Sequence, residues 1–199
     1  MMNQIVNCMI AGVGGQGTVF ASKLIAEAAI SYGLSVRTTE TIGMAQRGGS
    51  VVSHIRMGAQ IHSPLIPLHA ADIILAFEPA EGVRLLPYLT EKGIIIVCSS
   101  IIKPVTSSLN QDNYNAETML SFLTQQTKQL IIIDTAPLLE RCGSTKPLNV
   151  AILGAASKCG IFPFDELLLE QAIQAKTPER FLQMNLNAFQ LGKELYALS

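Results

Sequence analysis

Short apolar runs that alternate with helical patterns constrain this chain most. Ile5–Ala11 is a short apolar run ending in a glycine cluster, and Ala71–Phe77, Gly93–Cys98 and Gln129–Asp134 are further continuous apolar runs. Such runs are typical of parallel strands buried on both faces, and their alternation with helices is typical of an α/β fold. We therefore expect a single domain over residues 1–199, a three-layer α/β/α sandwich with a mostly parallel, Rossmann-like sheet.

The last part of the chain carries the clearest helix signal. Thr177 is the expected N-cap, Pro178 suits the first helical position, and Glu179 suits the positive end of the helix dipole. Apolar residues then recur at helical spacing from Phe181 to Leu198. Other helices are predicted over Ala21–Tyr32, Ala116–Thr127 and Asn149–Lys158, with a short one between Phe77 and Gly93, and further strands over Leu34–Thr38 and Ser50–Arg56.

The charge balance excludes several function classes. Lys and Arg number 14 against 15 Asp and Glu, so the net charge is −1. Without a basic excess we expect no binding of nucleic acid or of an anionic membrane surface. The apolar run near Ile94–Cys98 is far shorter than the roughly 20 residues of a membrane span. Only 15% of residues are charged, against about 25% in ordinary domains, which indicates either a neutral surface or a face covered by a partner.

The start of the chain and its cysteines bear on the compartment. The segment before Lys23, the first charged residue, lacks the basic start of a signal peptide, so we expect a cytoplasmic protein. Cys8, Cys98, Cys142 and Cys159 are far apart in the sequence. They are interpreted as reduced thiols and not as disulfides or metal ligands.

The first glycine motif lies between a predicted strand and a predicted helix. It runs Gly12-Val13-Gly14-Gly15-Gln16-Gly17, and Glu40 follows 23 residues after its last glycine. Glycines there allow backbone N–H groups to approach a phosphate at the helix N-terminus, and an acid at such a distance can bind a ribose. The alternative is that the glycines only permit a sharp turn and close packing of helix on strand.

The second glycine motif connects two predicted strands. It contains Gly43-Met44-Ala45-Gln46-Arg47-Gly48-Gly49-Ser50, whose guanidinium, amide and flexible backbone suit a phosphate, a carboxylate or a partner chain. An exposed connector with a solvated arginine is the alternative.

No catalytic set of residues emerges from the sequence. Neither loop holds a nucleophile with an evident base, His54 is expected to be a hydrogen-bonded or surface histidine, and His62 with His69 lacks a third metal ligand. Asp72, Glu78 and Asp134 each lie at an end of a predicted strand, where acids serve either active sites or helix caps.

Together the two glycine motifs carry a resemblance to a known family. The chain resembles the gamma-type subunits of the 2-oxoacid:ferredoxin oxidoreductases over essentially its whole length, including Asp72–Glu78, Asn149–Ala155 and Asn185–Gly192. Within that family the Gly43–Gly49 motif is most similar to the small (beta) subunit of the indolepyruvate-type enzymes. Nothing is carried over for Ile101–Glu117, where the match is poorest.

The resemblance implies a subunit whose isolated chain is inactive. The family oxidatively decarboxylates a 2-oxoacid with coenzyme A, yielding acyl-CoA, CO₂ and two electrons for ferredoxin. Thiamine diphosphate, Mg²⁺ and iron–sulfur clusters would lie in a large (alpha) partner subunit, since four scattered cysteines do not suit a cluster. Gly14, Gly15, Gln16 and Gly17, with Gln46, Arg47, Gly48, Gly49 and Ser50, would face either that partner or coenzyme A at the subunit interface.

Two other functions stay open at this point. A stand-alone dinucleotide-binding protein would use Gly12–Gly17 and Glu40, and a non-catalytic module of the same fold would have neither cofactor nor complex. Low charge fits the subunit best, because permanent interfaces resemble a domain core cut in half.

Overall fold

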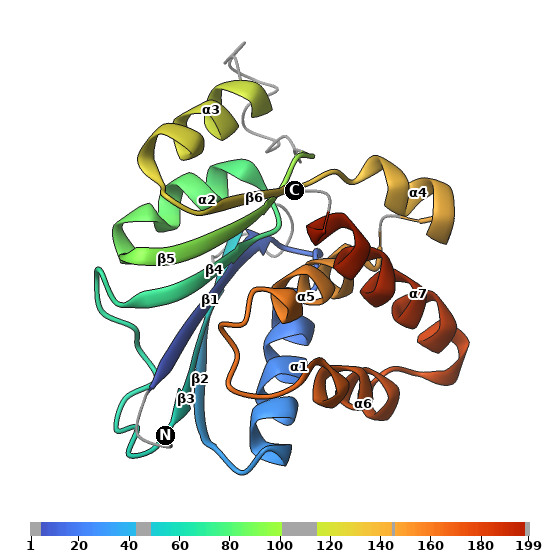
Figure 1. The fold of residues 1–199 in the computed structure, drawn as a ribbon, viewed down its shortest axis with the longest axis horizontal. Coiled ribbons are helices and arrows are strands. Elements are labelled where there is room, and N and C mark those ends of the chain that lie inside the picture. The colour runs from blue at the N-terminus through green and yellow to red at the C-terminus, as the bar shows by residue number, and fades with distance from the viewer. Residues whose placement is uncertain (1–4, 43–48, 101–114, 145, 198–199) are drawn as a thin grey trace.

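In the computed structural model, a six-stranded sheet lies between two layers of helices (Figure 1). The structure describes residues 5–42, 49–100, 115–144 and 146–197. The strands are β1 (Val6–Val13), β2 (Ser35–Ile42), β3 (Ser50–Gly58), β4 (Ala71–Ala76), β5 (Leu89–Cys98) and β6 (Leu130–Ile133). The helices are α1 (Thr18–Ser31), α2 (Pro79–Leu85), α3 (Ala116–Gln126), α4 (Ala136–Cys142), α5 (Leu148–Lys158), α6 (Glu166–Lys176) and α7 (Glu179–Tyr196), with a 3₁₀ turn at Leu86–Tyr88.

The sheet is mixed, with the strand order β2-β3-β1-β4-β5-β6. β1, β4, β5 and β6 pair in parallel, whereas β3 is antiparallel to both β1 and β2. Only residues 43–49 separate β2 from β3, and a parallel return would need a crossover of about a dozen residues or more. The expected α/β sandwich is therefore confirmed, and β3 is the exception to its parallel arrangement.

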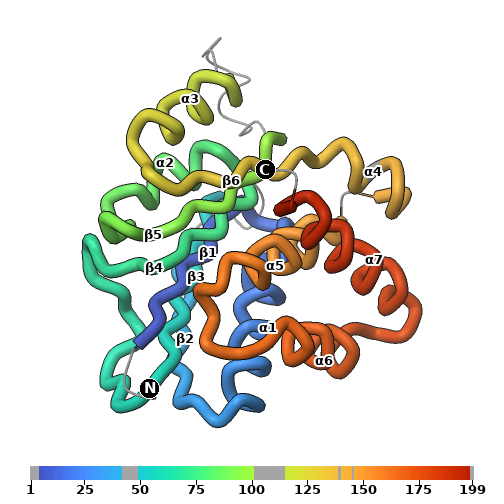
Figure 2. Tube along the Cα trace, viewed as in Figure 1, coloured from blue at the N-terminus to red at the C-terminus, as the bar shows by residue number. Residues whose placement is uncertain are grey.

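Side chains of the central strands point alternately to the two faces of the sheet and contribute to a hydrophobic core on each face. On β1, Cys8 and Ile10 join the core beneath α1, α5, α6 and α7, while Met9 and Ala11 join the core beneath α2 and α3. The tube trace shows the same two layers, with α1, α5, α6 and α7 on one side of the sheet (Figure 2). Because these strands are covered on both faces, they read as continuous apolar runs in the sequence.

Helices α5 and α7 cross in backbone contact. A Cβ at Gly154 would lie 2.1 Å from the Phe189 carbonyl oxygen, and a Cβ at Gly192 would lie 1.8 Å from the Ala151 carbonyl oxygen. Only glycine fits either position. This crossing sets the place of α7 over the sheet.

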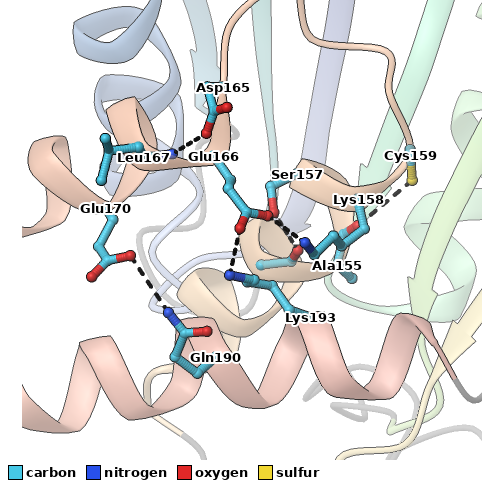
Figure 3. A network of polar contacts seen from close by, with 11 residues as sticks. Ala155, Ser157, Lys158, Cys159, Asp165, Glu166, Leu167, Glu170, Gln190 and Lys193 are labelled. Carbon is cyan, nitrogen blue, oxygen red and sulfur yellow. Dashed lines mark hydrogen bonds and ion pairs between the residues drawn. The ribbon is translucent and has the colours of Figure 1, made fainter.

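Charged side chains also join α5, α6 and α7 (Figure 3). Glu166 accepts from Lys158 and Lys193, each at 2.7 Å. Their hydrogen bonds hold the pKa of the Glu166 carboxyl below its usual value. Glu166 therefore links α6 to both α5 and α7.

The structure also corrects the start of the last helix. Thr177 is the C-cap of α6, its N–H donating to the Ile173 carbonyl, and Pro178 is the N-cap of α7. The Thr177 hydroxyl is buried without a hydrogen-bond partner among the described residues. A threonine before proline resembles a cap in the sequence, but α6 ends immediately before it and takes its backbone N–H.

Within the described ranges, no helix is long and apolar enough to cross a membrane.

Candidate functional site

The first glycine motif forms the turn between β1 and α1. Gly15 is exposed with φ +102°, and Gly17, the N-cap of α1, has φ +79°. Both conformations strongly favour glycine. No side chain caps the start of α1, so its first N–H groups form the positive end of a 14-residue helix.

Two side-chain amides hold this turn in place. Gln16 Oε1 accepts from the Val13 N–H at 2.7 Å, and its Nε2 donates to the Phe77 carbonyl at 3.1 Å. Asn149 Nδ2, from the first turn of α5, donates to the Gly17 carbonyl at 3.2 Å. A Cβ at Gly17 would lie 2.3 Å from that nitrogen. Gln16 therefore positions the turn, and its amide is already used within the chain.

The two glycine motifs meet at one edge of the sheet. Ser50 pairs with Val13 at the end of β1, and the Gly14 N–H donates to the Gly49 carbonyl at 2.9 Å. The antiparallel course of β3 brings its first residues to the carboxyl end of β1. Gln46, Arg47 and Gly48 lie outside the described residues, and Gly12 is buried in β1.

Two acids at the start of α2 lie against this edge. Glu78 is fully buried and caps α2, its carboxylate accepting from the Ala80 and Glu81 N–H groups at 2.9 and 3.3 Å. Glu81, which is 3% exposed, accepts from the Ser50 hydroxyl at 2.6 Å and lies 3.5 Å from Arg84. The hydrogen bond from Ser50 to Glu81 therefore ties the second glycine motif to the first turn of α2.

Glu40 does not reach the glycine turn. It pairs with Ser53 of β3, and β3 separates β2 from β1. Two strand spacings, roughly 10 Å, therefore lie between the Glu40 backbone and β1. In a dinucleotide fold the acid-bearing strand is β1's direct neighbour. The inserted antiparallel strand removes that geometry.

The remaining predicted residues lie elsewhere. His54 is buried, its Nδ1 accepts from the Ile66 N–H at 3.2 Å, and burial lowers its pKa. Asp134 caps α4 by accepting from the Ala136 N–H at 3.0 Å. Asp72 sits near the beginning of β4, away from the carboxyl edge, where it accepts from the Asn7 N–H. His62 and His69 are both exposed.

The four cysteines carry free thiols in apolar surroundings. Cys8 and Cys98 are fully buried in the sheet, and burial raises the pKa of both thiols. Burial also raises the pKa of Cys159 to about 11. Across the described part of the chain, no three His, Cys, Asp or Glu side chains gather where they could hold a metal ion.

The edge can therefore accept an anionic group or a partner surface, with Gly15 open to solvent beside the uncapped start of α1. Sequence reasoning missed Asn149 and Glu81 as supports of this edge. An asparagine before an apolar helical pattern suggests only a local cap, and its partner Gly17 lies 132 residues away.

Comparisons with known proteins place the chain among relatives of one kind. Residues 7–195 match the family model described as pyruvate ferredoxin/flavodoxin oxidoreductase. The indolepyruvate oxidoreductase subunit IorB of Archaeoglobus fulgidus is 35% identical over 94% of this chain and 93% of its own length.

Solved structures share the fold. The gamma subunit of a keto/oxoacid ferredoxin oxidoreductase from Geobacter sulfurreducens superposes with a TM-score of 0.68 at 22% identity, covering 98% of this chain and 99% of its own. The 2-oxoglutarate:ferredoxin oxidoreductase of Magnetococcus marinus, solved with 2-oxoglutarate, coenzyme A and succinyl-CoA, gives a TM-score of 0.70 at 20% identity. The match covers 99% of this chain and 32% of the length of the Magnetococcus marinus chain. The chain belongs to the 2-oxoacid:ferredoxin oxidoreductase family, as one of its gamma-type subunits.

Proposed function

We propose that this chain is the small subunit of an indolepyruvate-type 2-oxoacid:ferredoxin oxidoreductase. The complex would convert a 2-oxoacid and coenzyme A into acyl-CoA and CO₂, and the two electrons released would reduce ferredoxin. The relative named for indolepyruvate, which matches 94% of this chain, supports the aromatic substrate class.

The joined glycine motifs carry the proposal on the structural side. Gly14 and Gly49 are 35 residues apart in the chain, yet a 2.9 Å hydrogen bond links them at the carboxyl edge of β1. Ligands of open α/β sheets bind at this edge. Among the described residues, the acids at this edge are used within the chain: Glu78 caps α2, and Glu81 accepts a hydrogen bond from the Ser50 hydroxyl. An edge of this kind positions a ligand or partner and does not itself perform the chemistry.

The redox cofactors do not fit the described part of this chain. Iron–sulfur clusters need grouped thiolates, but Cys8 and Cys98 lie inside the sheet, and burial raises the pKa of their thiols. Mg²⁺ needs converging oxygen ligands, and no such group of acids occurs there. We therefore assign thiamine diphosphate, Mg²⁺ and the clusters to the large subunit.

Coenzyme A fits the glycine edge better. Its phosphates suit the uncapped start of α1, where Gly15 is exposed and no atom lies within 4 Å of a Cβ built on it. The chain would hold the phosphates by backbone N–H groups and leave the thiol free to reach the partner's active centre.

Co-expression with the large subunit tests the function. The complex should reduce a viologen dye anaerobically, in a reaction that needs both coenzyme A and an aromatic 2-oxoacid, and the large subunit alone should not. Activity that is undiminished without this chain would refute the subunit assignment. A preference for pyruvate or 2-oxoglutarate would refute only the substrate class.

Gly15→Asp tests the phosphate site, with Gly15→Asn as its uncharged match. The carboxylate should raise the KM for coenzyme A at least tenfold over Gly15→Asn, because it would repel a phosphate a few ångströms away. Gly33→Asp is the distant control, since Gly33 lies past the other end of α1, is exposed, and has φ +93° with no atom near its Cβ position. Equal KM values for the two Gly15 variants would show that the turn faces the partner and not the phosphates.

A further inference from the structure

Helix α1 carries few charged residues on the face that points away from the core. Its inner face packs Ala21, Leu24, Ile25 and Ala28 into the core. Its outer face would normally be polar, yet Lys23 and Glu27 are the helix's only charged residues, and Ile30 on that face is 58% exposed. A surface helix of a globular protein normally has charged and polar residues on the face opposite the core. The outer face of α1 therefore lacks the composition of a permanently solvated surface.

A groove runs along this outer face. Phe20 is shared by two adjoining hollows of about 210 and 410 Å³. The larger one continues along α1 to Ile30 and is closed on one side by Lys176 of α6. The smaller one passes between the starts of α5 and α7, where Phe181 and Met184 form its apolar wall. We call the two hollows together the α1 groove.

The rim of the α1 groove is basic. Lys23, Lys146 and Lys176 line it, against Glu27 as its one lining carboxylate. Glu27 already pairs with Lys176 at 3.0 Å, and among the described residues neither Lys23 nor Lys146 has an ion-pair partner. Nearby on α7, Arg180 stacks over the Phe181 ring at 4.7 Å and follows Glu179 in the sequence. A local positive excess stands out on a chain whose net charge is −1.

We infer that the α1 groove is the docking site for a segment of the large subunit that carries apolar side chains flanked by acidic ones. The inference rests on the proposed function, which supplies the partner. Apolar anchors would cover Phe20, Ile30 and Phe181, and carboxylates would meet Lys23 and Lys146. In the Magnetococcus marinus enzyme, the part that matches this fold makes up 32% of a longer chain.

Two other occupants fit the groove less well. A second copy of this chain would bring lysines against lysines across a two-fold axis. A small ligand is usually buried over most of its surface, whereas Ile30 and Phe181 remain 58% and 39% exposed. An extended or helical segment suits an open groove of this kind.

Competition for a limited amount of large subunit tests the inference. Tagged variants and untagged wild type are co-expressed with the large subunit, and mass spectrometry measures their ratio in the purified complex. Ile30→Glu and Lys23→Glu should enter the complex at least tenfold less than wild type. Leu68→Glu and Lys92→Glu are the controls: Leu68 is 57% exposed beneath the opposite face, Lys92 is exposed on β5, and both should enter equally with wild type.

The outcomes separate this inference from the proposed function. Exposed substitutions change stability by about 0.5 kcal/mol or less, so each variant's melting temperature serves as the folding check. Equal entry of folded Ile30→Glu and Lys23→Glu would overturn the docking site while leaving the proposed function intact. Failure of the wild type to enter any complex would refute the proposed function and the docking site together. A different result would assign the groove to a second copy of this chain and overturn the inference. In that case the wild type would form a dimer, Ile30→Glu would be monomeric, and Ile30→Glu would still enter the complex as well as wild type.

Discussion

The crossing of α5 and α7 makes a sharp prediction for Gly192→Ala. The new Cβ would lie 1.8 Å from the Ala151 carbonyl oxygen and 2.7 Å from its carbonyl carbon. Carbon–oxygen contacts ordinarily span about 3.3 Å or more, so the two helices would have to separate by about 1.5 Å. Both partners in the clash are backbone atoms of helices, and no side-chain rotation relieves it.

The energetic cost follows from that displacement. Overpacking typically costs about 1–3 kcal/mol, which includes the backbone shifts that it forces. A gap of about 1 Å already removes up to half of the dispersion energy between facing atoms. The gain of about 1 kcal/mol in helix propensity from glycine to alanine offsets part of this. With overpacking at the top of its usual range, we expect a net loss of about 2 kcal/mol, which lowers the melting temperature of a chain of this size by about 4–8 °C.

Gly82→Ala is the matched control for this measurement. Its Cβ would lie 3.2 Å from Ala76 Cβ and from Leu123 Cδ1, and the leucine methyl can shift. Its stability should stay within about 1 kcal/mol of wild type, because propensity and mild crowding nearly cancel. Thermal unfolding followed by circular dichroism compares the two. A Gly192→Ala melting temperature within about 2 °C of wild type, less than 1 kcal/mol, would refute the close crossing.

The thiols and a buried histidine make two further predictions. Ellman's reagent should modify at most Cys142 and Cys159 in the native chain and all four cysteines after unfolding, because Cys8 and Cys98 are fully buried; rapid native labelling of four thiols would contradict this. The rate at Cys159 should keep rising with pH toward its raised pKa of about 11. Burial lowers the pKa of the His54 imidazole from its ordinary value of 6.5. As the pH falls, the unfolded chain therefore binds a proton at this residue before the folded chain does, and stability should decrease as the pH drops below 6.5. The melting temperature of His54→Gln should fall less than that of wild type between pH 7 and 5, and parallel curves would show that His54 does not contribute.

Local sequence signals predicted the elements around the site well. The apolar run before Gly12 is β1, the helical pattern after Gly17 is α1, and Gly33 ends that helix with φ +93°. These features depend on residues within a few positions of one another. Backbone conformation at a glycine and burial of a short apolar run are short-range properties, which a single sequence displays directly.

Predictions that needed distant partners fared worse. Glu40 has the right spacing for a ribose-binding acid, but the sequence alone cannot reveal that β3 inserts between its strand and β1. Thr177 has the right neighbours for an N-cap, but α6 ends there and takes its N–H. In both cases a local pattern had two structural solutions, and contacts from elsewhere in the chain selected one.

By itself, the sequence determined an α/β chain with two glycine motifs and an unusually low content of charged residues. Tertiary structure alone decided that Gly14 meets Gly49, that Asn149 supports Gly17, and that the apolar outer face of α1 forms a basic-rimmed groove. Strand order and helix crossings join residues far apart along the chain. Their energies depend on packing and hydrogen bonds that no local stretch of sequence encodes.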